Sequence, residues 1–80
     1  MNKMSIELST GDTLRPGQGE RLADGLFRAV PSTMVEREHA SSLKGHNGQP
    51  VTVTLDGQSS SGILLSEQNR LTGEVRFTLK

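Results

Sequence analysis

The sequence predicts a small single domain of the α+β class over residues 1–80: an N-terminal strand, one or two short helices and a C-terminal antiparallel three-stranded meander. Two observations support this prediction. In the C-terminal third, apolar and polar residues alternate over Val51 to Leu55 and over Val75 to Leu79, as in half-buried strands. Before them, Thr33 to Glu36 reads as a capping box, which predicts a helix. A mostly β small barrel is the alternative.

The first predicted element is a strand near the N-terminus. Met4, Ile6 and Leu8 alternate with polar residues, and the Thr-Gly-Asp sequence at residues 10–12 is typical of a turn that ends a strand. Residues 14–20, which contain a proline and two glycines, are expected to form a loop.

Residues 20–30 allow two interpretations. In the first they form a helix with one apolar stripe, whose members are Leu22, Ala23, Leu26, Phe27 and Val30. In the second, Asp24-Gly25 is a hairpin turn that leads into a strand over residues 26–30. We favour the helix, because a strand would place Phe27 and Ala29 on one face and leave two further apolar residues on the other.

A second short helix is expected to begin after Thr33 and to end at Gly45. The threonine hydroxyl and the carboxylate of Glu36 would each accept a hydrogen bond from the other residue's amide. The inner face of this helix is predicted to contain Met34 or Val35, followed by His39, Ala40 and Leu43.

The C-terminal hairpin turns at Asp56-Gly57, and its register is the main question. A two-residue loop would set the valine face of residues 51–55 against Ser60 and Gly62, which offer it little apolar surface. We therefore expect a three-residue loop or a bulge at Gly62. With either one, the side chains of Ile63 and Leu65 would point into the core and that of Leu64 would point outward.

The last strand is expected to be an edge of the sheet. Residues 66–73 would form a long turn with Leu71 tucked beneath it, and the strand over residues 75–79 would follow. An edge strand has unpaired amides and carbonyls, so a partner strand or a second copy of the chain could add to it.

Composition narrows the classes of function. Nine basic and nine acidic residues cancel, which argues against attraction of the whole surface to nucleic acid or to anionic lipid. Phe27 and Phe77 are the only aromatic residues, too few for a platform that stacks bases. There is no cysteine and no apolar run long enough to cross a bilayer, so we expect a cytoplasmic protein without a membrane partner.

Candidate chemistry is sparse. Glu36 and His39 would share a helix face, with His46 just beyond its end, but no fourth ligand has a suitable spacing for a metal site. No serine lies in the context of a nucleophile elbow. We therefore predict no catalytic residue, no metal, no cofactor and no enzymatic activity.

Residues 33–80 combine a helix, short strands and an Asp-Gly hairpin, and in this they loosely resemble the start of an Sm-like or SH3-like small barrel. The resemblance implies a small barrel over these residues. It assigns no functional residue.

The favoured function is a non-enzymatic protein-binding module: an inhibitor, adaptor or regulator, of the kind that phages and mobile elements encode, acting through a sheet edge or a helix face. Its partner would be a protein, or a second copy joined through the edge strand. The alternative is a small barrel that binds nucleic acid where C-terminal basic residues meet Lys44. The candidate binding residues are Arg70, Glu74, Arg76, Thr78 and Lys80.

Overall fold

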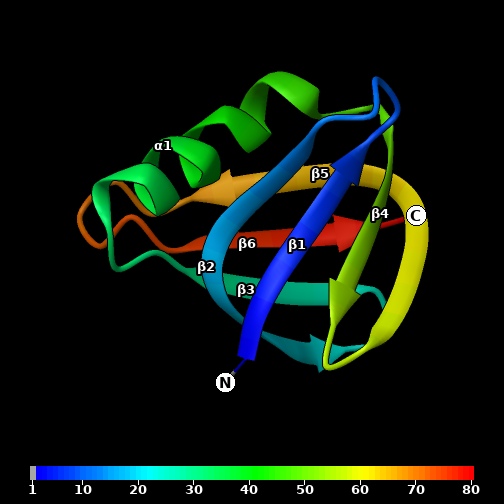
Figure 1. Ribbon diagram of the computed structural model, residues 1–80, viewed down its shortest axis with the longest axis horizontal. Helices are drawn as coiled ribbons and strands as arrows, with labels where there is room; N and C mark the ends of the chain where they lie inside the picture. Colours follow the sequence, from blue (N-terminus) through cyan, green and yellow to red (C-terminus); the bar gives the residue numbers. More distant parts are fainter. Residues whose placement is uncertain (1) are drawn as a thin grey trace.

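The computed structural model, which describes residues 2–80, is a closed barrel of six antiparallel strands with one α-helix and one short 3-10 helix (Figure 1). The strand order around the barrel is β1-β2-β3-β6-β5-β4, and β4 pairs back onto β1. The fold is therefore mostly β, and the expected α+β domain with a three-stranded meander is wrong. The elements are β1 (Asn2–Leu8), β2 (Thr13–Ala23), β3 (Leu26–Val30), α1 (Met34–Ser42), η1 (Leu43–His46), β4 (Pro50–Leu55), β5 (Gln58–Gln68) and β6 (Val75–Leu79).

Two long, curved strands close the barrel. The first part of β2 pairs with β1 and its second part with β3, while β5 pairs first with β4 and then with β6. Strand β6 also pairs with β3, so it has a neighbour on both sides. The expectation that the last strand is a sheet edge is therefore wrong. The barrel also includes β1 to β3, which precede the residues that carried the resemblance to Sm-like and SH3-like barrels.

Residues 14–20, expected to be a loop, belong to β2, and their glycines are required by close packing. Gly17 has a φ of 116°, and a Cβ there would collide with the carbonyl oxygen of Val30. A Cβ on Gly19 would collide with the side chain of Met4 on β1. These glycines therefore let β2 pass close to its neighbours, and they do not mark a flexible loop.

Residues 20–30 form a hairpin, so the favoured helix is wrong and the strand alternative is correct. Asp24-Gly25 makes the turn, with Gly25 at a φ of 73°. Phe27 and Ala29 point into the core, where the Phe27 ring stacks on that of Phe77 with centroids 5.3 Å apart. The other face is half-buried, which explains why apolar residues occur on both sides of β3.

The core fills the barrel, and α1 with η1 covers one end of it (Figure 1). The two Asp-Gly turns, at residues 24–25 and 56–57, lie at the opposite end (Figure 1). Within residues 2–80, no helix combines the length and the apolar character needed to cross a membrane. The buried apolar residues are Met4, Ile6, Leu8, Phe27, Ala29, Ala40, Leu43, Val51, Val53, Leu64, Val75 and Phe77.

The β4–β5 hairpin uses the register that the sequence analysis rejected. Asp56 and Gly57 have φ values of 55° and 75°, as in a two-residue type I′ turn, and Val53 pairs with Ser60. The expected three-residue loop or bulge at Gly62 is wrong. A Cβ at Gly62 would lie 2.9 Å from the carbonyl oxygen of Lys80, so this glycine makes room for the end of the chain.

The same register reverses the expected burial on β5. Leu64 is fully buried, whereas Ile63 and Leu65 are 39% and 42% exposed. On the outer face of the hairpin, hydroxyl pairs connect the two strands: Thr52 with Ser61 at 2.9 Å and Thr54 with Ser59 at 3.0 Å. These cross-strand bonds favour the observed pairing.

Candidate functional site

Four of the predicted binding residues, at every second position from Glu74 to Lys80, follow the outer face of β6: Arg76 and Thr78 belong to the strand, and Glu74 and Lys80 flank it. Glu74 accepts a hydrogen bond from Arg76 Nε at 3.3 Å and lies 3.9 Å from Arg28 Nη1. Arg28 in turn contacts Glu20 at 2.6 Å. Glu67 of β5 is directly opposite Arg76 in the strand register.

This outer face therefore carries alternating charges and is not a basic surface. Two arginines, Arg28 and Arg76, are accompanied by three carboxylates, those of Glu20, Glu67 and Glu74. Because the positive charges are balanced locally, the face has little attraction for phosphates. The nucleic-acid alternative required Lys44, Arg70, Arg76 and Lys80 to converge; of these, Lys44 and Arg70 line one hollow, whereas Arg76 lies on the outer face of β6.

A second group of cations lies between α1 and the end of β5. Two hollows, of about 340 and 460 Å³, run side by side there and share Gln68 and Arg70 in their walls. Arg37 and Ser41 border the first and Lys44 borders the second. We call this surface, formed by Arg37, Ser41, Lys44, Gln68 and Arg70, the basic groove.

The helix accounts for the alignment of the basic groove. Arg37, Ser41 and Lys44 are spaced four and three residues apart, so they share one side of α1 and η1. Ser41 Oγ accepts a hydrogen bond from Gln68 Nε2 at 3.2 Å, which connects this side of the helix to β5. Arg37 was not among the predicted binding residues, although its seven-residue spacing from Lys44 on the expected helix was a usable signal.

The three cations of the basic groove have no charged partner. Arg37, Lys44 and Arg70 form no ion pair and no side-chain hydrogen bond with any residue from 2 to 80. One acidic residue, Glu67, lines the groove. In a chain with no net charge, the groove is therefore a local excess of positive charge.

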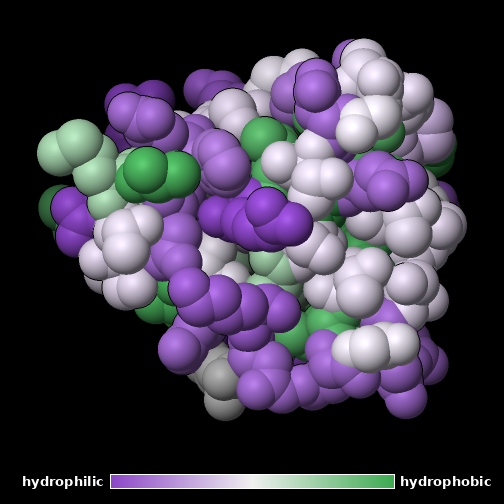
Figure 2. All heavy atoms as spheres, in the orientation of Figure 1, coloured by the Kyte–Doolittle hydropathy of each residue, from purple (hydrophilic) through white to green (hydrophobic). Residues whose placement is uncertain are grey.

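Exposed apolar side chains border the basic groove. Met34 and Val35, in the first turn of α1, are 78% and 60% exposed, and Leu71 in the β5–β6 loop is 97% exposed. Met34 and Leu71 each share a hollow with Arg37. Figure 2 shows hydrophobic atoms at the end of the molecule where α1 begins. We call Met34 and Leu71, the two that share a hollow with Arg37, the apolar tip.

Two expectations about the exposed apolar residues are wrong. Neither Met34 nor Val35 belongs to the inner face of α1, which consists of Glu36, Ala40 and, at the start of η1, Leu43. Leu71 is not tucked beneath its loop, which is a tight turn held by Asn69 side-chain and backbone hydrogen bonds. These apolar groups therefore lie outside the core of residues 2–80 and contribute little burial to the fold.

Glu36 fastens α1 to the barrel. The capping box is confirmed: Glu36 N donates to Thr33 Oγ1 at 3.1 Å, and Glu36 Oε1 accepts from the Thr33 amide at 3.3 Å. The amide and hydroxyl of Ser32 also donate to Oε1, each at 2.9 Å, and Lys3 Nζ on β1 lies 3.4 Å from Oε2. Mainly through the Ser32 hydrogen bonds, these contacts lower the pKa of Glu36 from 4.5 to about 2.

The two histidines have separate surroundings. His39 Nδ1 accepts a hydrogen bond from the Arg15 amide at 2.8 Å, and His46 Nδ1 lies 3.4 Å from Gln49 Oε1. Glu36, the third residue considered for a metal, is occupied by the cap. Among residues 2–80, no three acidic, histidine or cysteine side chains are grouped as metal ligands.

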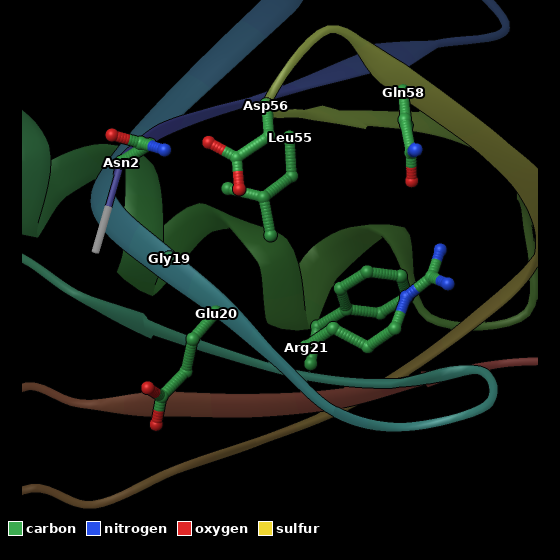
Figure 3. A pocket seen from close by; sticks show the side chains of 8 residues that line it. Asn2, Gly19, Glu20, Arg21, Leu55, Asp56 and Gln58 are labelled. Atoms are coloured by element: carbon green, nitrogen blue, oxygen red, sulfur yellow. The ribbon is translucent and has the colours of Figure 1, made fainter.

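A further hollow, of about 370 Å³, opens at the other end of the barrel, beside the β4–β5 turn (Figure 3). Asn2 and Asp56 lie at one side of it, and Arg21 and Gln58 at the other (Figure 3). The guanidinium carbon of Arg21 is 5.4 Å from the Phe27 ring centroid, and Nη2 donates to Ser60 Oγ at 3.0 Å. Because Arg21 already has these partners, this hollow presents less unpaired charge than the basic groove.

Comparison of the chain with protein family models, with curated protein sequences and with solved structures found no match.

Proposed function

We propose that the protein is a non-enzymatic protein-binding module that acts through the helix face formed by the basic groove and the apolar tip. The observation that carries the proposal is the combination, on one face, of three cations without an ion-pair partner in residues 2–80 and two strongly exposed apolar side chains, those of Met34 and Leu71. Exposed apolar groups beside unpaired charges are typical of binding surfaces, where a partner covers both.

The face contributes little to the stability of the chain itself. Arg37, Lys44 and Arg70 hold no other element in place, and Met34 and Leu71 are outside the core. Selection for stability alone does not explain two strongly exposed apolar side chains, Met34 and Leu71, next to cations that have no partner in residues 2–80. A partner that buries the tip supplies a reason.

The sheet-edge form of the proposal loses its basis, because β6 is paired on both sides. The same finding removes the basis for a homodimer through an edge strand. The nucleic-acid alternative has less support than a protein partner, since the outer face of β6 is balanced by acidic residues and the two aromatic residues, Phe27 and Phe77, are buried. A groove with three cations offers few phosphate contacts.

Affinity capture with quantitative mass spectrometry tests the proposal. The bait is the full chain, and the extract comes from the organism that encodes it. We expect one protein to be retained by the wild type and lost with Met34→Ser/Leu71→Ser. The matched control is Ile63→Ser/Leu65→Ser, which removes two exposed apolar residues from the outer face of β5.

The control should retain the same protein, with thermal melting verifying that both variants fold. Equal retention by the tip variant and the wild type would contradict the proposal. So would loss of the protein with the control variant alone.

A further inference from the structure

We infer that the partner presents a short extended segment with two acidic side chains about three residues apart and an apolar residue beyond the acid that contacts Arg37. This inference rests on the proposed function and specifies the chemistry of the partner. It is carried by the positions of the cations in the basic groove and of the apolar tip relative to them.

The spacing of the acidic residues follows from helix geometry. Arg37 and Lys44 are seven residues apart along α1 and η1. At about 1.5 Å per residue their backbones are separated by roughly 10 Å along the helix. An extended segment advances about 3.3 Å per residue, so roughly three residues span that distance.

Charge complementarity selects carboxylates as the groups in the groove. Guanidinium groups form two parallel hydrogen bonds with a carboxylate, and both Arg37 and Arg70 border the same hollow without a partner. Ser41 Oγ, which accepts from Gln68, has its own proton free to donate to an anionic ligand. A second carboxylate would lie next to Lys44 and Arg70 in the neighbouring hollow.

The positions of Met34 and Leu71 define at which end of the partner segment the apolar residue lies. Met34 precedes Arg37 by almost one helical turn, and Leu71 borders the hollow that contains Arg37. A backbone rise of about 4.5 Å between residues 34 and 37 corresponds to one or two residues of an extended segment. An apolar side chain at that distance from the acid over Arg37 would cover the tip. A nucleic acid would leave the tip uncovered.

The test uses a display library of random peptides selected on the immobilised full chain. We expect the selected sequences to share two Asp or Glu residues three positions apart, with an apolar residue flanking one of them. A synthetic peptide of this sequence should lose about tenfold or more in affinity when both acids become Asn or Gln, and a comparable amount when they are made adjacent.

A pair of protein variants with the same change in charge locates the site. Arg37→Glu/Arg70→Glu should lower the affinity for this peptide by about a hundredfold. The control, Arg15→Glu/Lys80→Glu, alters net charge equally and should change it by less than about threefold. Neither control side chain forms an ion pair with any residue from 2 to 80.

Other outcomes would overturn the inference and are distinguishable from failure of the proposed function. Selected peptides that lack acids, or that bind Arg37→Glu/Arg70→Glu as well as wild type, would reject the acidic segment while the capture experiment still supports a binding module. Failure to select any peptide, combined with binding of a single-stranded RNA or DNA oligonucleotide that this variant loses, would assign the groove to nucleic acid.

Discussion

The arginines on the outer face of β3 and β6 differ from those beside α1 in what surrounds them. Arg28 and Arg76 lie opposite each other on neighbouring strands. Each also has a carboxylate directly opposite it on its other neighbouring strand, and Arg76 has a further one two residues away in the chain. Arg37 and Arg70 border a hollow whose other lining residues are uncharged, among them Ser41, Gln68 and the apolar Leu71. The comparison shows that the number of basic residues in a segment does not indicate a binding face, because the strand register decides which charges are balanced.

The largest expected effect concerns the inner side of β6. Phe77→Ala should lower the free energy of unfolding by about 3–5 kcal/mol, because the ring is buried and stacks on Phe27. Leu71→Ala, at the apolar tip, should change it by less than about 0.5 kcal/mol. Urea unfolding of both variants measures the difference. Comparable losses in the two would show that the tip is part of the core.

A smaller effect concerns the attachment of α1, which positions the basic groove. The pKa of Glu36 is lowered in the folded state, so its contribution to stability is complete above about pH 4.5 and is lost as pH falls towards about 2. Glu36→Gln should therefore melt at a lower temperature than wild type near neutral pH. The gap between them should close below pH 4.5. A constant gap down to pH 2 would contradict this role.

The smallest effects test the comparison of the two arginine groups directly. Glu74→Gln removes a carboxylate from the partly exposed network with Arg28 and Arg76 and should cost about 1 kcal/mol. Arg37→Gln should change the free energy of unfolding by less than about 0.5 kcal/mol, since Arg37 has no partner in residues 2–80. Denaturant titration at low salt measures both. A larger loss for Arg37→Gln would show that the groove is structural.

Features that depend on neighbouring residues in the chain were predictable. The alternation in β1, the capping box of Thr33 and Glu36, and the position of the turn at Asp56-Gly57, though not its length, are as expected, since each is determined by a few consecutive residues. The face shared by Arg37 and Lys44 was equally local, and helical spacing alone could have identified it.

Features that depend on distant residues were not predictable. Gly17 and Gly19 were interpreted as part of a loop because the groups that lie against them are remote in sequence. These groups are the backbone of Val30 at Gly17 and the side chain of Met4 at Gly19. The hairpin register places Gly62 against the end of β6, and Glu67 of β5 lies opposite Arg76 only because the sheet pairs the two strands.

The sequence by itself determined the position of the turn at Asp56-Gly57, the start of α1 and the alternation of β1, β4 and β6, because these follow from backbone sterics and local hydrogen bonds. Only the tertiary structure decided that the sheet closes, that Leu64 rather than Leu65 is buried, and that the arginines of β3 and β6 are balanced while those beside α1 have no ion-pair partner in residues 2–80. The physical reason is that closure pairs β3 with β6 and β1 with β4, contacts between residues far apart in the chain that no local pattern specifies.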